Sequence, residues 1–207
     1  MSTDDHGDAR SAHVDRLGAG ALDVRELRAE TWNDLERVLG SNGGARGCWC
    51  MHWRLSIAEW MAGKGEGNRQ AMKALASREE APGVLAYKGD EPVAWCSLGP
   101  RSAFPRLERS RLLASVDDEP VCAITCIFVH RQHRGAGLLT AVLDAVCDYA
   151  ATLDHAIVEG YPIEPRPGRR AGSDTAMTGI ASAFLAAGFT EVARPKADRP
   201  IMRRSLN

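Results

Sequence analysis

Hydrophobic and polar residues along this chain follow patterns that predict strands and helices in alternation. Residues 122–129, Cys-Ala-Ile-Thr-Cys-Ile-Phe-Val, are almost wholly apolar and lack the period-two alternation of a half-exposed strand. Such a run is typical of a central strand that is buried on both faces of a sheet. A polar turn and Gly135-Ala136-Gly137 follow, and apolar residues then recur at helical spacing over residues 138–153. We therefore predict a buried strand, a glycine-rich turn and an amphipathic helix.

The other segments predict a mixed α/β order around this unit. We expect strands at 22–27, 84–87, 92–98, 156–161, 190–193 and 201–205, and helices at 32–39, 57–61, 69–78 and 180–187. Thr31, Ser56 and Asn68 precede three of the helices as N-cap residues, and Ser56 forms a capping box with Glu59. The strand at 156–161 should run parallel to the buried strand because a helix connects the two.

Composition indicates one globular domain. The chain has 207 residues, 44% of them hydrophobic and 26% charged. The polar residues 1–20 predict a disordered leader, followed by a single domain over 21–207. The net charge of −1 argues against nucleic-acid binding. No apolar run has the length of a membrane span and no signal peptide is apparent. We therefore expect a cytoplasmic protein that does not bind a membrane. The six cysteines lie mostly in apolar runs and should be reduced.

The turn before residue 138 is suited to binding an anion. Free backbone N–H groups and the helix dipole attract phosphate at a helix N-terminus, and glycines allow it to approach closely. A P-loop is excluded because no Lys-Ser or Lys-Thr follows a Gly-x4-Gly. A dinucleotide fingerprint would need a small residue at Thr140, although Glu159 lies about 20 residues further on, as that motif requires. A dinucleotide-binding oxidoreductase is therefore a remote alternative.

Two stretches resemble landmarks of the GNAT acetyltransferase superfamily. Arg134-x-x-Gly137-x-Leu139 is similar to its motif A, Arg/Gln-x-x-Gly-x-Gly/Ala, with Leu139 in place of the small residue; Gln132-x-x-Gly135-x-Gly137 fits the pattern in an offset register. Residues 183–189, Ala-Phe-Leu-Ala-Ala-Gly-Phe, resemble the second landmark. The resemblance spans about residues 22–206. It implies the GNAT fold, an α/β (α+β) architecture with a mixed central β-sheet flanked by helices and parallel strands that splay apart at the acyl-CoA cleft.

The resemblance also implies a reaction and its cofactor site. GNAT enzymes transfer an acetyl group from acetyl-CoA directly to an amine acceptor, which here can be a small molecule or an amine of a peptide or protein. The chain is also a candidate homodimer. Strand backbone would pair with pantetheine and the glycine turn would receive the pyrophosphate. The implied cofactor-binding residues are Ile127, Phe128, Val129, Arg134, Gly135, Ala136, Gly137, Leu138 and Leu139.

The resemblance does not supply the usual catalytic acid. The family's usual acid is a tyrosine at the position of Phe184, which cannot donate a proton. Glu159 and Tyr161, on the parallel strand, are candidate substitutes, with Thr125 as a polar member of the central strand. Packing roles for Glu159 and Tyr161 remain open. So does a second function class, a module that senses acetyl-CoA without catalysis.

Two further clusters have alternative interpretations. Cys48, Cys50 and His52 alternate, as ligands on an extended zinc-binding segment would, but the spacing is unusual, and a packed thiol and aromatic cluster is favoured, so that no metal is expected. A role in the substrate pocket is open for Trp49, His52 or Trp53. The segment 99–111 contains four arginines, for which a solvated face is favoured over contact with an acidic substrate or with the cofactor's phosphate: Arg101, Arg106, Arg109 and Arg111.

Overall fold

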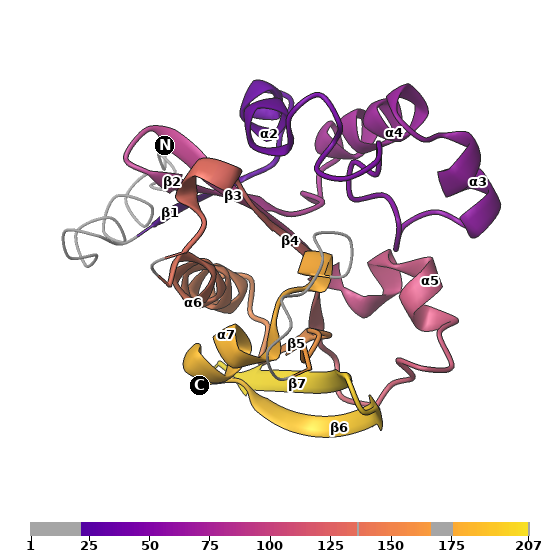
Figure 1. Ribbon diagram of the computed structural model, residues 1–207, viewed down its shortest axis with the longest axis vertical. Coiled ribbons are helices and arrows are strands. Elements are labelled where there is room, and N and C mark those ends of the chain that lie inside the picture. The colour runs from indigo at the N-terminus through magenta and orange to yellow at the C-terminus, as the bar shows by residue number, and fades with distance from the viewer. Residues whose placement is uncertain (1–21, 136, 167–175, 207) are drawn as a thin grey trace, which may run out of the picture.

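The computed structural model describes residues 22–135, 137–166 and 176–206, and the predicted leader lies outside them. Seven strands form one mixed sheet in the order β1-β2-β3-β4-β5-β7-β6 (Figure 1). The strands are β1 (Asp23–Glu26), β2 (Val84–Lys88), β3 (Glu91–Pro100), β4 (Cys122–Val129), β5 (Ile157–Gly160), β6 (Thr190–Lys196) and β7 (Arg199–Ser205). The helices are α2 (Trp32–Leu39), α3 (Ile57–Ala62), α4 (Glu66–Ala76), α5 (Pro105–Glu108), α6 (Leu138–Ala151) and α7 (Ala181–Ala186), with short 3₁₀ turns η1 (Arg101–Ala103), η2 (Arg131–His133) and η3 (Ala176–Thr178).

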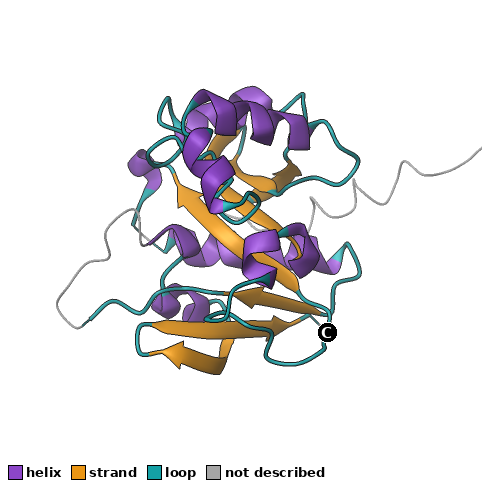
Figure 2. Ribbon diagram, turned by 90° about the vertical axis from the view of Figure 1, so that its right-hand side faces the viewer, coloured by secondary structure: helices purple, strands orange, loops and turns teal. Residues whose placement is uncertain are grey.

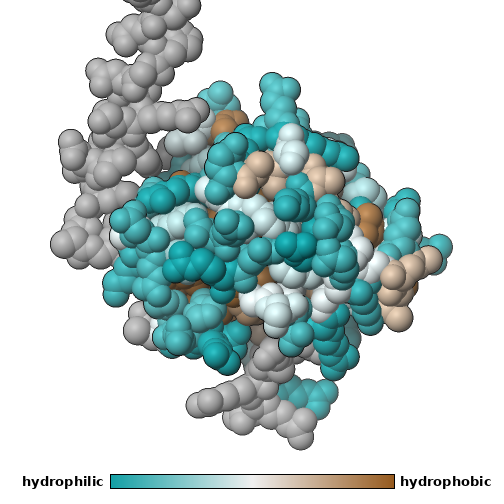
Figure 3. All heavy atoms as spheres, turned by 90° about the horizontal axis from the view of Figure 1, so that it is seen from above, coloured by the Kyte–Doolittle hydropathy of each residue, from teal (hydrophilic) through white to brown (hydrophobic). Residues whose placement is uncertain are grey.

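Helices cover both faces of this sheet, which explains the uninterrupted apolar sequence of β4. On one face, α6 and α7 pack over a core that includes Ile124, Ile127 and Val142. On the other face, α2, α4 and the turns near Cys50 enclose a second core, and α5 encloses a third around Phe104. The predicted central strand is thus confirmed as buried on both sides. Hydrophilic residues cover most of the outer surface over α2, α3 and α4 (Figure 3).

The only parallel strand pair in the described part of the sheet is β4 with β5, as predicted, and it is short. Pairing runs from Cys122 opposite Val158 to Ile124 opposite Gly160 and then ends, whereas β4 continues to Val129. The pairing of β4 with β3 skips Thr125, because Ser97 lies opposite Cys126 and Leu98 opposite Ile124. Such a bulge bends a strand and increases its twist. Strands β7 and β6, which lie lowest in Figure 1, run obliquely to β4 when the molecule is seen as in Figure 2. Beyond Ile124, no strand among the described residues pairs with this edge of β4, which we call its open edge.

Two of the three predicted helix caps are wrong, because each of these side chains forms hydrogen bonds with other backbone groups. The capping box at Ser56 is confirmed, since the Ser56 side chain accepts from the Glu59 backbone and the Glu59 side chain accepts from Ser56. Thr31 does not cap α2; its hydroxyl bonds the backbone of Arg28 and Glu26. Asn68 lies inside α4, fully buried, and donates to the carbonyls of Gly47 and Trp60.

The described helices include none that is both long enough and apolar enough to pass through a membrane. All six cysteines are buried and free, as predicted.

Candidate functional site

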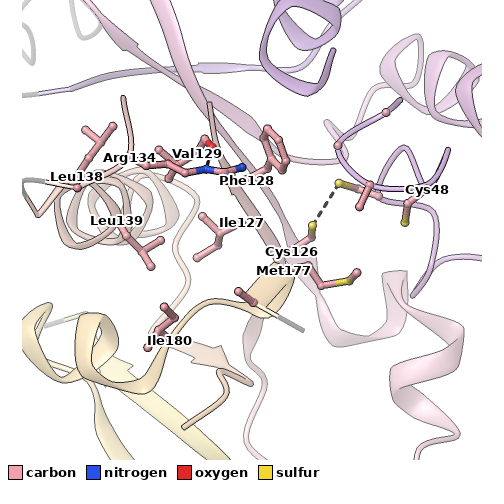
Figure 4. Close-up of a pocket in the computed structure, with 16 residues that line it drawn as sticks. Cys48, Cys126, Ile127, Phe128, Val129, Arg134, Leu138, Leu139, Met177 and Ile180 are labelled. Atoms are coloured by element: carbon pink, nitrogen blue, oxygen red, sulfur yellow. Dashed lines mark hydrogen bonds between the residues drawn. The ribbon is translucent and has the colours of Figure 1, made fainter. Parts of the chain in front are cut away.

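A cavity of about 350 Å³ lies beside the open edge of β4 (Figure 4). Its floor is the part of β4 that has left β5, and its walls come from the start of α6, from η3 and from the turns before α3. The lining residues are Gly43, Gly44, Ala45, Cys48, Cys50, Cys126, Ile127, Phe128, Val129, Arg134, Gly135, Leu138, Leu139, Ala176, Met177 and Ile180. Most of these side chains are apolar, so the cavity suits an acyl chain more than a charged group.

The structure brings seven of the nine predicted cofactor-binding residues together on this lining, from Ile127 on β4 to Leu139 on α6. Gly137 is the N-cap of α6, with φ +77°, and Gly135 has φ +99°. A Cβ atom at either glycine would meet no described atom within 4 Å, so the turn opens onto free space. Ala136 lies outside the described residues. Glycine is suited to both positions because other residues rarely adopt such φ values.

Arg134 extends along the mouth of this cavity. Its Nε atom donates to the carbonyl of Val129 at 3.0 Å, and its guanidinium lies 5.5 Å from the ring centroid of Phe128. The side chain is exposed, so this positive charge is accessible beside the helix N-terminus. The two together form an environment that attracts phosphate.

The opposite wall was not predicted as part of the site. Residues 43–50 form successive turns, and Trp49 and Cys50 adopt positive φ values of 48° and 57°. Cys48, Cys50 and His52 therefore do not lie on one extended segment as the sequence suggested. The Sγ atoms of Cys50 and Cys126 lie 3.2 Å apart, at the dashed line in Figure 4. Within the described residues, no group of three or more His, Cys, Asp or Glu side chains is placed to hold a metal ion.

The aromatic residues of this segment pack beside the cavity rather than on its surface. Trp49 is buried, with its ring stacked 5.9 Å from that of Trp32. His52 contacts Trp53 and Trp60 edge-on, at centroid distances of 5.1 and 5.0 Å. The predicted thiol and aromatic cluster is thus present, divided between the cavity wall and the core behind it.

The three predicted catalytic residues do not line the cavity. Glu159 is 1% exposed; its carboxylate bonds Arg203 Nε at 2.7 Å and Arg101 Nη1 at 3.3 Å. Tyr161 donates to the same carboxylate at 2.5 Å, and burial, followed by the charge of Glu159, raises the pKa of its hydroxyl. Thr125 is the buried bulge residue and faces Ser97. These positions suit packing and charge pairing, and the catalytic assignments stay predictions.

Arg101 corrects another expectation. Its side chain is only 11% exposed and forms ion pairs with Glu159 and Glu108, so it does not belong to a solvated basic face. No local pattern in the sequence indicates this arrangement, because its buried partner Glu159 lies 58 residues further along the chain.

Phe184 fills the space where the family's tyrosine was expected. It is fully buried, lies edge-on to Phe189 at 4.9 Å, and packs on Gly160 and Gly179. A Cβ atom on Gly160 would lie 2.2 Å from the Phe184 ring, so this glycine is required by close packing. Ile180, one turn earlier, reaches the cavity instead.

Comparisons with solved structures support the fold. An acetyltransferase from Thermus thermophilus is 18% identical, with 92% of this chain and all of that chain covered and a TM-score of 0.51. A GNAT-family acetyltransferase from Listeria monocytogenes 4b F2365 is 11% identical, with coverage of 92% and 99% and a TM-score of 0.55. AAC(6')-Ib in complex with ribostamycin and coenzyme A is 14% identical, with coverage of 89% and 93% and a TM-score of 0.51. No curated protein matches the sequence.

The family is established by the sequence itself. Residues 49–159, more than half of the chain, match the Acetyltransferase (GNAT) family. The matched segment begins at Trp49 in the cavity wall and includes the β2–β3 hairpin, β4, the glycine turn and α6. The chain therefore belongs to the GNAT family of acetyltransferases.

Proposed function

We propose that this chain is a single-domain enzyme that transfers an acetyl group from acetyl-CoA to an amine acceptor. One observation carries the proposal. The open edge of β4 leads directly to the glycine turn at the start of α6, and a largely apolar cavity lies along the whole path.

Each part of acetyl-CoA has a matching environment along this path. The pantetheine arm would lie along residues 126–129, whose backbone has no strand partner on that side within the described residues. The pyrophosphate would bind at the N-terminus of α6, where N–H groups, the helix dipole and Arg134 favour negative charge. Coenzyme A is present in the solved AAC(6')-Ib complex that shares this fold.

The proposed reaction is direct transfer. The nitrogen lone pair of an unprotonated amine attacks the thioester carbonyl, the C–S bond breaks, coenzyme A leaves as a thiolate, and the nitrogen loses one proton. Backbone N–H groups on the open edge of β4 are suited to stabilising the oxyanion that forms at the carbonyl oxygen. The described lining contains no Asp or Glu. Because Phe184 offers no hydroxyl, water or the amine's own proton would protonate the thiolate.

Two measurements test this function. Acetyl-CoA at about 100 times its dissociation constant should stabilise the fold by about 2.7 kcal/mol in a melting experiment. Free coenzyme A should then be released in proportion to acceptor when a panel of primary amines is supplied. Stabilisation without thiol release from any amine would favour an acetyl-CoA sensor. Stabilisation by NADH but not by acetyl-CoA would contradict the proposal.

A further inference from the structure

Three arginines beside the cavity lack the carboxylate partners that other partly buried arginines of this chain have. Arg203 pairs with Glu159 and Asp117, and Arg101 pairs with Glu159 and Glu108. The exceptions are Arg54, Arg106 and Arg199, for which the described residues supply no ion pair within 4.0 Å; the charge of Asp198, next to Arg199 in the chain, only opposes the lowering of the Arg199 pKa by burial.

Hydrogen bonds to neutral groups use only some of the N–H donors of Arg106 and Arg199. Arg106 Nη1 donates to the carbonyl of His52 at 2.9 Å and contacts His52 Nδ1 at 3.2 Å. Arg199 Nη1 donates to the carbonyl of Tyr161 at 3.1 Å and to the Thr178 hydroxyl at 2.9 Å. The Nε and Nη2 atoms of both arginines have no partner among the described residues and are not buried. These donors are therefore available to a ligand.

Arg54 is the third of these arginines. Its Nη2 atom donates to the carbonyl of Pro82 at 2.7 Å, and its guanidinium stacks 4.4 Å from the ring centroid of Phe104. Its Nε atom is buried with no hydrogen-bond partner in the described part of the chain. Burial lowers the pKa of Arg54 to about 10, so the group is still charged at neutral pH.

The three arginines contact members of one packed cluster: the Arg106 guanidinium lies 5.8 Å from the ring centroid of Trp53, Arg54 stacks on Phe104, and Arg199 donates to the carbonyl of Tyr161. His52, which contacts Arg106 at 3.2 Å, lies close enough for two of these charges to act on it. Burial, and then the charges of Arg106 and Arg199, lower the pKa of the imidazole to about 4. His52 is consequently neutral and accepts from Arg106 at neutral pH. A buried cation that lacks a counter-ion is unfavourable. An anionic ligand would relieve this cost.

The cluster adjoins the acceptor side of the cavity. Arg106 donates to the carbonyl of His52, which follows Cys48 of the cavity wall by four residues. Thr178, which binds Arg199, follows directly after Met177 of the lining. In Figure 4, Cys48 and Met177 lie on the side of the cavity away from α6 and its phosphate-binding turn.

We propose that Arg106 and Arg199, supported by Arg54, form a subsite for an oxyanion, a carboxylate or a phosphate, carried by the amine acceptor. The inference rests on the proposed acetyl transfer, because it assigns the acceptor of that reaction. Guanidinium groups bind both oxyanions through pairs of parallel N–H donors. The anion would hold the acceptor with its amine toward the thioester, and neutral or purely cationic amines would lack this contact.

The test compares matched acceptors with the 207-residue chain. Amino acids are compared with their carboxamides, and O-phosphoethanolamine with ethanolamine, by thiol release at saturating acetyl-CoA. We expect kcat/KM to be about 10- to 100-fold higher for the anionic member of one pair, the range for a charge-assisted hydrogen-bond pair. The pair that shows the preference identifies the oxyanion. Equal rates for both members of every pair would overturn the subsite while leaving acetyl transfer intact.

Variants then locate the preference. Arg106→Gln and Arg199→Gln should raise KM for the anionic acceptor and abolish its advantage, with KM for acetyl-CoA unchanged. Arg109→Gln, an exposed position just after α5, is the matched control and should change neither. Arg106→Lys and Arg199→Lys, which keep the charge, should restore part of the preference, and melting curves identify any variant that is poorly folded. If no amine releases thiol, calorimetric titration of the same anionic amines into the coenzyme A complex replaces the rate. Binding that is indifferent to both arginines would refute the subsite.

Discussion

Replacing Glu159 with glutamine distinguishes a structural role from a catalytic one. The carboxylate is 1% exposed and lies 2.7 Å from Arg203 Nε and 3.3 Å from Arg101 Nη1. Glutamine has the same shape but no charge, so the change removes two ion pairs while the volume is kept. Tyr161 also loses its charged acceptor.

The magnitude follows from this geometry. At an effective dielectric constant of about 20, charges about 3 Å apart attract by about 5 kcal/mol per pair, and the cost of removing them from water offsets much of this gain. Breaking a buried ion pair typically costs about 3–5 kcal/mol. Arg203 keeps Asp117 and Arg101 keeps Glu108 in the variant, so we expect the lower end, about 3 kcal/mol. For a domain of this size, the melting temperature should fall by about 6–12 °C.

The assay combines calorimetry with turnover. Glu108→Gln is the control, because Glu108 is an exposed partner of Arg101 and its loss should cost less than about 1 kcal/mol. Turnover is measured well below the melting temperature of the variant. Because Glu159 does not line the cavity, we expect turnover within about threefold of wild type, far less than the loss of about 100-fold or more that removing a general base causes. A variant that melts like wild type but loses turnover about 100-fold, with the loss smallest at high pH, would refute the structural reasoning and establish Glu159 as the base.

Two further predictions concern the acetyl-CoA cleft. Gly137→Val should strain the turn by about 1–2 kcal/mol and weaken acetyl-CoA binding at least about tenfold by calorimetry, whereas Gly89→Val, with φ +61° in the β2–β3 hairpin and equally open space, should lose stability but keep that affinity; equal affinity losses in both would show that the turn at Gly137 is not the anion site. Phe184→Tyr should bury a hydroxyl against Gly160 and Gly179, lower stability by about 1–3 kcal/mol in a denaturant titration and leave the rate of thiol release no higher, so a faster enzyme would contradict this packing.

The strand, turn and helix of the proposed acyl-donor half of the site were predictable because they are local in sequence. A buried strand, a glycine turn and an amphipathic helix follow one another within about thirty residues, and each has its own periodicity. The order of strands and helices could be predicted for the same reason. The end of α7 was predictable from a single glycine, because Gly188 adopts φ +77° just after the helix, as glycines that terminate helices commonly do.

Several of the failed predictions share a different cause, which is that contacts with other segments of the chain decided them. Asn68 has the side chain of a helix cap, but buried carbonyls of Gly47 and Trp60 take its amide. Arg101 looks like part of a basic surface until Glu159, 58 residues away, is brought beside it. The bulge at Thr125, which bends β4 where it leaves β5, has no recognisable signal in the strand's own composition.

The proposed acceptor half of the site shows why family membership does not specify the acceptor. Its wall consists of successive turns that include positive φ values at Trp49 and Cys50, a geometry that no propensity favours. Such turns persist only because surrounding packing holds them, here the stacked rings of Trp32 and Trp49 and the contact of Cys50 with Cys126 on β4. The strand that we propose to bind the acyl donor therefore also anchors the loop that we propose to face the acceptor. Substitutions at Trp32 or Trp49 should for this reason alter the selectivity for the acceptor before they alter the binding of acetyl-CoA.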